Sequence, residues 1–229
     1  MSVVKWVAGG WILFTVENVF LSENRTRLIE FLGQERYHAL FNTLSSTALV
    51  SIAYGYLRFG PGRAVNPISR FFGGGFVVCG CALLSQLPLF QTSGNKKVNL
   101  SDDEVTGVYK VTRHPMLYGI GLVGLGLALR AKFTGRRALF AGPLGVALVG
   151  THHQDSRFRR GMGGTLTETR DLDSPNIPFS AFIRGRHAWS KLIEEVDVEN
   201  LIFGVAGSQF LMWSIWLVGK RRSSIQKKK

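Results

Sequence analysis

The stretch VTRHPMLYGIGLVGLGLALR, residues 111–130, decides the fold of this chain. An arginine and a histidine stand directly before Pro115, and no Asp, Glu, Lys or Arg occurs among the 16 residues between Arg113 and Arg130. Proline suits the first turn of a helix, because the N–H that it lacks would have no partner there. The stretch therefore predicts an apolar helix over 114–130 that begins at a charged boundary.

Similar uncharged runs recur along the chain and indicate the fold class. They cover residues 37–57, 71–95, 138–154 and 200–219, with lengths of 21, 25, 17 and 20 residues. A helix needs roughly 20 apolar residues to cross a bilayer core of about 30 Å. Arginines that flank a shorter run reach the interface and extend its span. The runs predict an all-α, polytopic membrane helix bundle of about five to six transmembrane helices.

The chain divides into these helices and their connections. We expect membrane helices over 3–21, 37–58, 71–91, 114–130, 137–154 and 199–219, a short interfacial helix within 22–36, and a capping box from Ser101 to Glu104. Residues 1–219 then form a single membrane domain, with a polar extramembrane segment over 155–198, and residues 220–229 form a basic tail. The glycines of 114–130 are expected to permit close helix packing, or else to form a smooth wall for a lipid.

The first of these helices carries polar residues. Lys5 lies near one end, and no clear small-residue cleavage site follows the apolar stretch, so we expect a retained membrane helix rather than a signal peptide. Glu17 and Asn18 form an intramembrane polar pair. An ionisable residue inside a membrane helix suggests a function, and the alternative is a hydrogen bond or ion pair to a neighbouring helix.

The charge of the chain restricts its partners. The formal net charge is +13, and the 28 basic residues are spread over nearly every connection instead of forming one stripe. A nucleic-acid-binding protein would gather them on one face, so we expect no nucleic-acid partner. The tail KRRSSIQKKK, residues 220–229, is expected to bind anionic phospholipid or an acidic partner.

Arg113 and His114 are the first candidate site residues. The free N–H groups at a helix start, together with an arginine, can bind an anion such as a lipid phosphate or the carboxylate of S-adenosylmethionine. Asp155 is the third candidate, in this anion-binding or headgroup-binding role as a partner of that pair. The alternative is that Arg113 and His114 only anchor the helix and pair with Asp155 or a headgroup. We expect no catalytic residue among them.

Other chemistry-bearing pairs are poorly placed for a metal ion. Cys79 and Cys81 are two residues apart and point in different directions on a helix. His152 and His153 are adjacent and lie about 100° apart, so joint chelation is geometrically poor. No metal site is expected.

Three stretches together carry a resemblance to a known family. LGQERYHALFNTLSSTALVSIAYGY at 32–56, VTRHPMLYG at 111–119, and HHQDSRF with NIPFSAFIRGR at 152–158 and 176–186 resemble the NnrU family of membrane proteins. A branch of this family includes 15-cis-zeta-carotene isomerase, a haem b enzyme. The resemblance implies a membrane helix bundle. For that branch it implies cis–trans isomerisation of a polyene by ligated haem.

The departures from the family pattern bear on haem. Alignment with the isomerase branch puts Asn18 and Leu127 where histidines are implicated as haem ligands. Leucine has no lone pair, and an amide is a poor axial ligand compared with imidazole. His114, His152 and His153 are the fallback haem ligands. The methyltransferases that share a similar RHP signature use an acidic pair, and here Gln154 and Asp155 provide one acid.

These observations together predict an accessory role. We expect a non-catalytic, NnrU-like accessory subunit of a larger organellar membrane complex, without a cofactor of its own. Other membrane-complex subunits and anionic phospholipid are its expected partners. The mitochondrial inner membrane is favoured over a plastid membrane. The alternatives are a haem-dependent carotenoid or lipid isomerase and, behind it, a lipid methyltransferase that uses S-adenosylmethionine.

Overall fold

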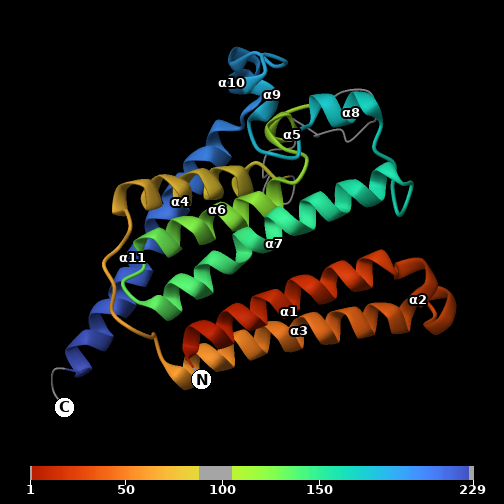
Figure 1. Ribbon diagram of the computed structural model, residues 1–229. Coiled ribbons are helices and arrows are strands. Elements are labelled where there is room, and N and C mark those ends of the chain that lie inside the picture. The colour runs from red at the N-terminus through yellow and green to blue at the C-terminus, as the bar shows by residue number, and fades with distance from the viewer. Residues whose placement is uncertain (1, 88–104, 227–229) are drawn as a thin grey trace.

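The computed structural model describes residues 2–87 and 105–226, which fold almost entirely into helices (Figure 1). The helices are α1 (Val3–Glu23), α2 (Arg25–Leu32), α3 (Gln34–Phe59), α4 (Arg70–Ser85), α5 (Val108–Val111), α6 (Pro115–Arg130), α7 (Thr134–Arg159), α8 (Glu168–Asp173), α9 (Ser180–Ile183), α10 (Trp189–Glu195) and α11 (Val198–Gln226). The all-α prediction is confirmed for this part of the chain. The expected capping box at 101–104 lies outside the described residues.

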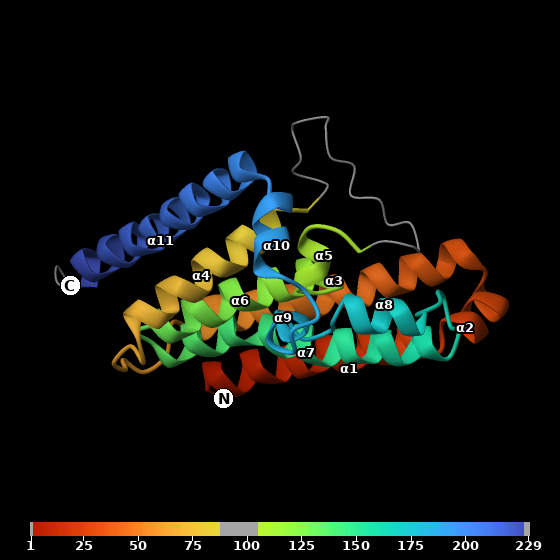
Figure 2. The same cartoon turned by 90° about the horizontal axis from the view of Figure 1, so that it is seen from above.

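The long helices pack as a row. Along this row the order is α3, α1, α7, α6, α4 and α11, and each helix packs against the next. Figure 1 shows α1 and α3 as an antiparallel hairpin beside the layer of α7, α6 and α4. In Figure 2, α11 lies along the outer side of α4. The short helices α5, α8, α9 and α10 lie at the ends of the long helices, on the side where α6 begins (Figure 1).

The ends of α1, α3 and α6 agree with the expected boundaries to within a few residues. The other long helices differ from the expected boundaries at one end or both. Helix α7 runs beyond the expected 137–154 at both ends, and α11 continues past 219 to Gln226. Arginine and lysine are good helix formers, so charged flanks prolong a helix instead of ending it. Helix α4 ends at Ser85, and a proline at 88 disfavours helical conformation at Leu87. The rest of the expected helix, 88–91, lies outside the described residues.

Glycines bring α4 and α6 into close contact. A Cβ on Gly80 would lie 2.6 Å from the Gly119 carbonyl oxygen, and a Cβ on Gly73 would lie 2.7 Å from that of Gly126. The other face of α6 uses Gly124 in the same way, where a Cβ would meet the Phe140 carbonyl of α7. The predicted close packing of the α6 glycines is confirmed, and it holds α6 between α4 and α7.

Two tryptophans of α1 fill the spaces beside glycines of the neighbouring helices α3 and α7. Trp6 covers Gly55 of α3 and donates from Nε1 to the Ser51 carbonyl at 2.8 Å. Trp11 covers Gly142 of α7 and donates to the Leu139 carbonyl at 3.1 Å. Each indole therefore buries its ring against a helix that has no side chain at that point and still satisfies its N–H.

Much of the surface of these helices is apolar. Among the described residues, α1 is long and apolar enough to cross a membrane, whereas α4 and α6 are apolar but shorter at 16 residues each. Large hydrophobic side chains are nevertheless exposed on each of the six long helices, for example Phe20, Tyr54, Phe72, Met116, Leu148 and Phe210. Soluble monomers rarely leave so many together in contact with water.

Candidate functional site: a buried ionic network

A cluster of polar side chains, with a buried centre and a partly exposed edge, lies where α6 begins and α7 ends. It joins α6, α7, α8 and the loop after α8, and we name it the Asp155 network. Its members are Thr112, Arg113, His114, Tyr118, Thr151, Asp155, Arg159, Asp171 and Asn176. The three residues predicted from the sequence, Arg113, His114 and Asp155, lie at its centre.

Asp155 is the most deeply placed acid of the network, at 1% exposure. It accepts hydrogen bonds from His114 Nε2 at 2.7 Å and from Asn176 Nδ2 at 2.6 Å, and Arg113 Nε lies 3.2 Å from its Oδ2. Burial opposes the charged form, but these hydrogen bonds and the arginine charge outweigh it and hold the pKa of Asp155 below its ordinary value. Asp155 is therefore an ionised carboxylate at neutral pH.

Arg113 connects Asp155 to a second carboxylate. Its Nη2 lies 2.5 Å from Asp171 Oδ1, and Arg159 Nη2 lies 2.8 Å from Asp171 Oδ2. Burial works against ionisation of Asp171 as well, but the hydrogen bonds from both arginines prevail and lower its pKa. Two arginines thus face two carboxylates. Two guanidinium nitrogens of Arg113, Nε and Nη1, are buried without a hydrogen-bond partner among the described residues, although Nε lies within ion-pair distance of Asp155.

Backbone groups fix the loop at 174–176 to the start of α6. Arg113 N–H donates to the Pro175 carbonyl at 3.0 Å, and the Thr112 hydroxyl donates to the Asn176 carbonyl at 2.6 Å. The Asn176 amide oxygen accepts from the Tyr118 hydroxyl at 2.8 Å. Because Asn176 also donates to Asp155, its side chain joins the loop to both α6 and α7.

A spacing of four residues along a helix explains how these side chains meet. This spacing is present in the sequence and could have indicated Thr151, Arg159 and Tyr118 as further members. Thr151, Asp155 and Arg159 are four residues apart on α7 and so share one face. His114 and Tyr118 have the same spacing at the start of α6. The loop residue Asn176 belongs to a segment between two prolines, and no helical period points to it.

Chemically, the network contains a His–Asp pair. Such a pair fixes the orientation of an imidazole and stabilises its protonated form, which is how enzymes prepare a histidine for proton transfer. In His114 the pairing occupies Nε2 and leaves Nδ1 as the remaining ring nitrogen. The residue is 9% exposed.

The other residues singled out from the sequence lie apart from this network. His152 is exposed, and His153 faces α1, with its Nε2 3.8 Å from Glu23. The Asn18 amide donates to Ser45 Oγ of α3 at 3.2 Å, so it makes the interhelical hydrogen bond that was one alternative for the Glu17 and Asn18 pair. One carboxylate oxygen of Glu17 is buried without a hydrogen-bond partner.

The two positions that the resemblance implicates in haem ligation carry side chains that do not suit haem iron. Asn18 uses its amide nitrogen within the chain, donating to the Phe14 carbonyl at 2.7 Å as well as to Ser45. Leu127 is buried at 8% exposure and offers no donor atom. Neither side chain can coordinate a haem iron as an imidazole does.

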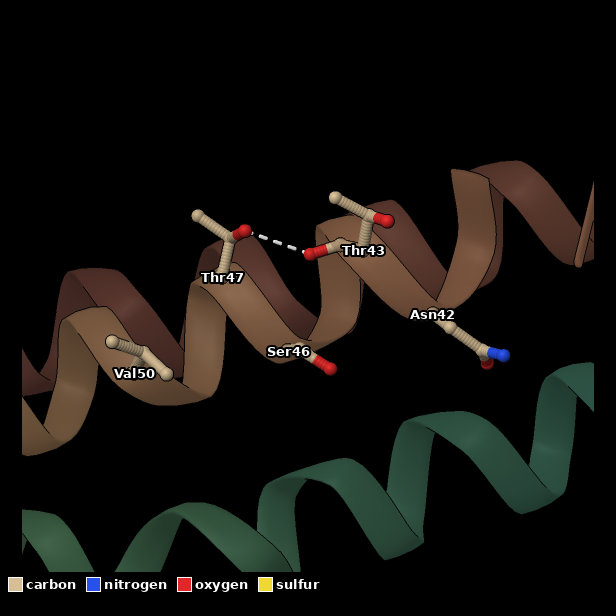
Figure 3. Close-up of a pocket in the computed structure, with 5 residues that line it drawn as sticks. All are labelled: Asn42, Thr43, Ser46, Thr47 and Val50. Atoms are coloured by element: carbon tan, nitrogen blue, oxygen red, sulfur yellow. Dashed lines mark hydrogen bonds between the residues drawn. The ribbon is translucent and has the colours of Figure 1, made fainter. Parts of the chain in front are cut away.

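A shallow groove along α3 is lined by four polar residues and a valine (Figure 3). Its lining residues are Asn42, Thr43, Ser46, Thr47 and Val50. The Thr47 hydroxyl donates to the Thr43 carbonyl at 2.7 Å, the bond drawn in Figure 3, so it is occupied by its own helix. The groove brings no acid or base together.

The fold and this network define an all-helical protein in which a buried ionic network joins an RHP signature to the end of the following long helix. The NnrU protein family model matches residues 7–219, so the chain belongs to the NnrU family. Comparison with curated proteins and with solved structures returned no match.

Proposed function

We propose that this chain is a multi-pass membrane protein that acts as a non-catalytic accessory subunit of a larger organellar membrane complex. The mitochondrial inner membrane is the compartment we favour. The proposal has three supports, which concern the surface, the Asp155 network and the haem positions.

The surface supports membrane insertion. Exposed apolar side chains occur on all six long helices, and the row arrangement leaves wide helix faces uncovered. In α11, Phe203 and Phe210 are 70% and 67% exposed, while Ser208 on another face is fully buried. A helix that points its apolar face outward and its polar residues inward is suited to lipid or to the helices of other subunits.

The main support for the proposal is that the residues of the RHP signature bond to other residues of the same chain. Arg113, His114 and Asp155 form ion pairs and hydrogen bonds with one another, with Asp171 and with Asn176. The ion pairs and hydrogen bonds of this buried network fix the relative position of the elements that they join, with Arg113 Nε and Nη1 left without a hydrogen-bond partner in the described part of the chain. The RHP signature then serves as a brace between α6, α7 and the loop after α8.

The haem positions add to this interpretation. An amide already bonded to two neighbours and a leucine occupy the places of the two implicated histidines. In the alignment with the isomerase branch the implicated ligand residues are replaced, while the family model still matches residues 7–219, as expected of a relative that keeps a structural role.

The test is extraction of the protein in a mild detergent, sizing on a native gel, and an absorption spectrum of the same band. An accessory subunit migrates in a large assembly together with other chains. A small colourless band would contradict the proposal and direct attention to S-adenosylmethionine binding. A small band with a Soret absorption would instead support the haem isomerase, and variants of His114, His152 and His153 would then identify the ligand.

A further inference from the structure

We propose that a phosphate group binds between Arg157 and Arg25, at the end of the α1–α7 pair. The phosphate belongs either to a phospholipid headgroup or to a free phosphate compound. The site is separate from the Asp155 network, which uses a different face of α7, and it does not depend on the accessory role.

Arg157 is a buried cation whose hydrogen bonds are incomplete. It is 7% exposed, and its Nη1 donates to Ser22 Oγ of α1 at 2.7 Å. Its Nε is buried without a hydrogen-bond partner. A guanidinium has five N–H donors in a planar fork, and burying its charge is unfavourable unless an anion compensates it. A serine hydroxyl is neutral and leaves the charge uncompensated.

The nearby acid is committed elsewhere. Glu23 accepts from Arg160 Nη1 at 2.6 Å and from Arg160 Nη2 at 2.9 Å, which makes a two-point pair. His153 Nε2 lies 3.8 Å from the same carboxylate. Both carboxylate oxygens of Glu23 therefore bond to Arg160, and Arg157 interacts with this carboxylate only at longer range.

A second arginine points to the same place. A Cβ on Gly163 would lie 3.5 Å from Arg157 Nη2 and 3.9 Å from Arg25 Nη1, so the two guanidinium groups converge beside this glycine. Gly163 has a φ of 80°, and its lack of a side chain leaves the space next to both groups open. Two like charges directed at one point repel unless an anion lies between them.

A phosphate group suits this arrangement. Its oxygens match the fork geometry of arginine, and two guanidinium groups can hold one phosphate by paired hydrogen bonds. The place in the fold also suits a headgroup, because Arg25 begins α2 directly after the apolar α1 and Arg157 lies beyond the uncharged run 138–154.

The experiment uses the full chain in detergent and compares Arg25→Gln with Arg27→Gln. Arg27 is exposed on the same short helix, so its variant is the matched control, and both variants leave the buried Arg157 in place. Thermal unfolding is followed against inorganic phosphate at constant ionic strength, set with sodium chloride. In parallel, the chain is reconstituted into vesicles of phosphatidylcholine with one-fifth phosphatidic acid, and its thermal unfolding there is compared with that in vesicles of phosphatidylcholine alone.

We expect Arg25→Gln to weaken binding about tenfold in one of these arms and Arg27→Gln to leave it unchanged, since one charge-assisted contact pair is lost. A stabilisation by inorganic phosphate identifies a free phosphate compound as the ligand. A response to the phosphatidic acid vesicles alone identifies a headgroup. Equal behaviour of the two variants in both arms, or no binding by the wild-type chain in either, would overturn the proposal.

Discussion

Asp155 is the residue on which the start of α6 and the end of α7 depend together. It is fully surrounded by Arg113, His114 and Asn176, and each of the three directs a donor or a positive charge at its carboxylate. Removal of its charge leaves Asp171 as the one anion paired with Arg113 among the described residues and takes a charged acceptor from His114 and Asn176, which is costly in a buried network.

We therefore predict that Asp155→Asn lowers the free energy of unfolding by about 3 kcal/mol or more. The amide keeps the shape of the carboxylate, so the loss reports charge and hydrogen bonding rather than packing. Thermal or denaturant unfolding in detergent measures it. Asp173→Asn, in the neighbouring α8, is the control, because Asp173 is not a member of the Asp155 network. Equal stability of the two variants would show that the brace is not structural.

The same carboxylates predict how stability depends on pH. The pKa values of Asp155 and Asp171 are lower in the folded protein than in the unfolded chain, where aspartate titrates near about 3.9. A group with a depressed folded pKa stabilises the fold above its unfolded pKa, and this stabilisation is lost as pH falls through its folded pKa. We expect the contribution of these two carboxylates to the melting temperature to be steady above about pH 5 and to fall in acid. In Asp155→Asn with Asp171→Asn this fall should be shallower, and an unchanged profile would assign the acid sensitivity to other groups.

At the scale of elements, the contact between α4 and α6 relies on the absence of side chains. Gly80→Ala would place a methyl group 2.6 Å from the Gly119 carbonyl oxygen and 2.7 Å from the backbone nitrogen of Val123. Backbone cannot turn aside as a flexible side chain can, so the two helices must separate. Overpacking of this kind costs about 1–3 kcal/mol.

We predict this destabilisation for Gly80→Ala and the opposite sign for Gly75→Ala on the same helix. A Cβ on Gly75 meets nothing within 4 Å, and alanine is the better helix former by up to about 1 kcal/mol. Melting temperatures of the two variants against wild type measure the difference. If Gly75→Ala were as damaging as Gly80→Ala, the loss would lie in the helix itself and not in its packing against α6.

The sequence predicts these elements well where local physics decides them. The uncharged runs locate the long helices, and Pro115 fixes the start of α6 at the residue where the structure has it. The ends of α7 and α11 escape prediction because arginine and lysine continue a helix as readily as they flank one. Which helices become neighbours is not local information, and the row from α3 to α11 departs from chain order.

The residues of the candidate site were likewise predictable only in part. Arg113, His114 and Asp155 could be named from their residue types and from the position of the proline. Asp171 and Asn176 could not, because their places in the Asp155 network come from the fold of the loop after α8 and not from a period in the sequence. Arg157 gave no signal either, since an arginine at a helix end is ordinarily a solvated charge.

For the molecule as a whole, the decisive question is what covers its exposed apolar faces, and Cys79 gives a direct answer. Cys79 lies in α4, and its side chain is exposed, while Cys81 is half-buried. Maleimides react with the thiolate, which forms in water but not in lipid. If α4 crosses a bilayer, Cys79 faces hydrocarbon and stays unreactive in intact membranes.

We predict that Cys79, alone after Cys81→Ala, reacts with a charged maleimide roughly tenfold or more slowly than a cysteine placed at Thr26 in a chain without Cys79 and Cys81. Thr26 is exposed on the polar helix α2, where water reaches it. Labelling is followed by gel shift in membranes opened to both sides, and labelling in denaturant confirms that both thiols are intact. Equal rates in the membrane would place the exposed face of α4 in water. The exposed phenylalanines of α4, Phe71 and Phe72, would then be a docking surface for protein and not for lipid.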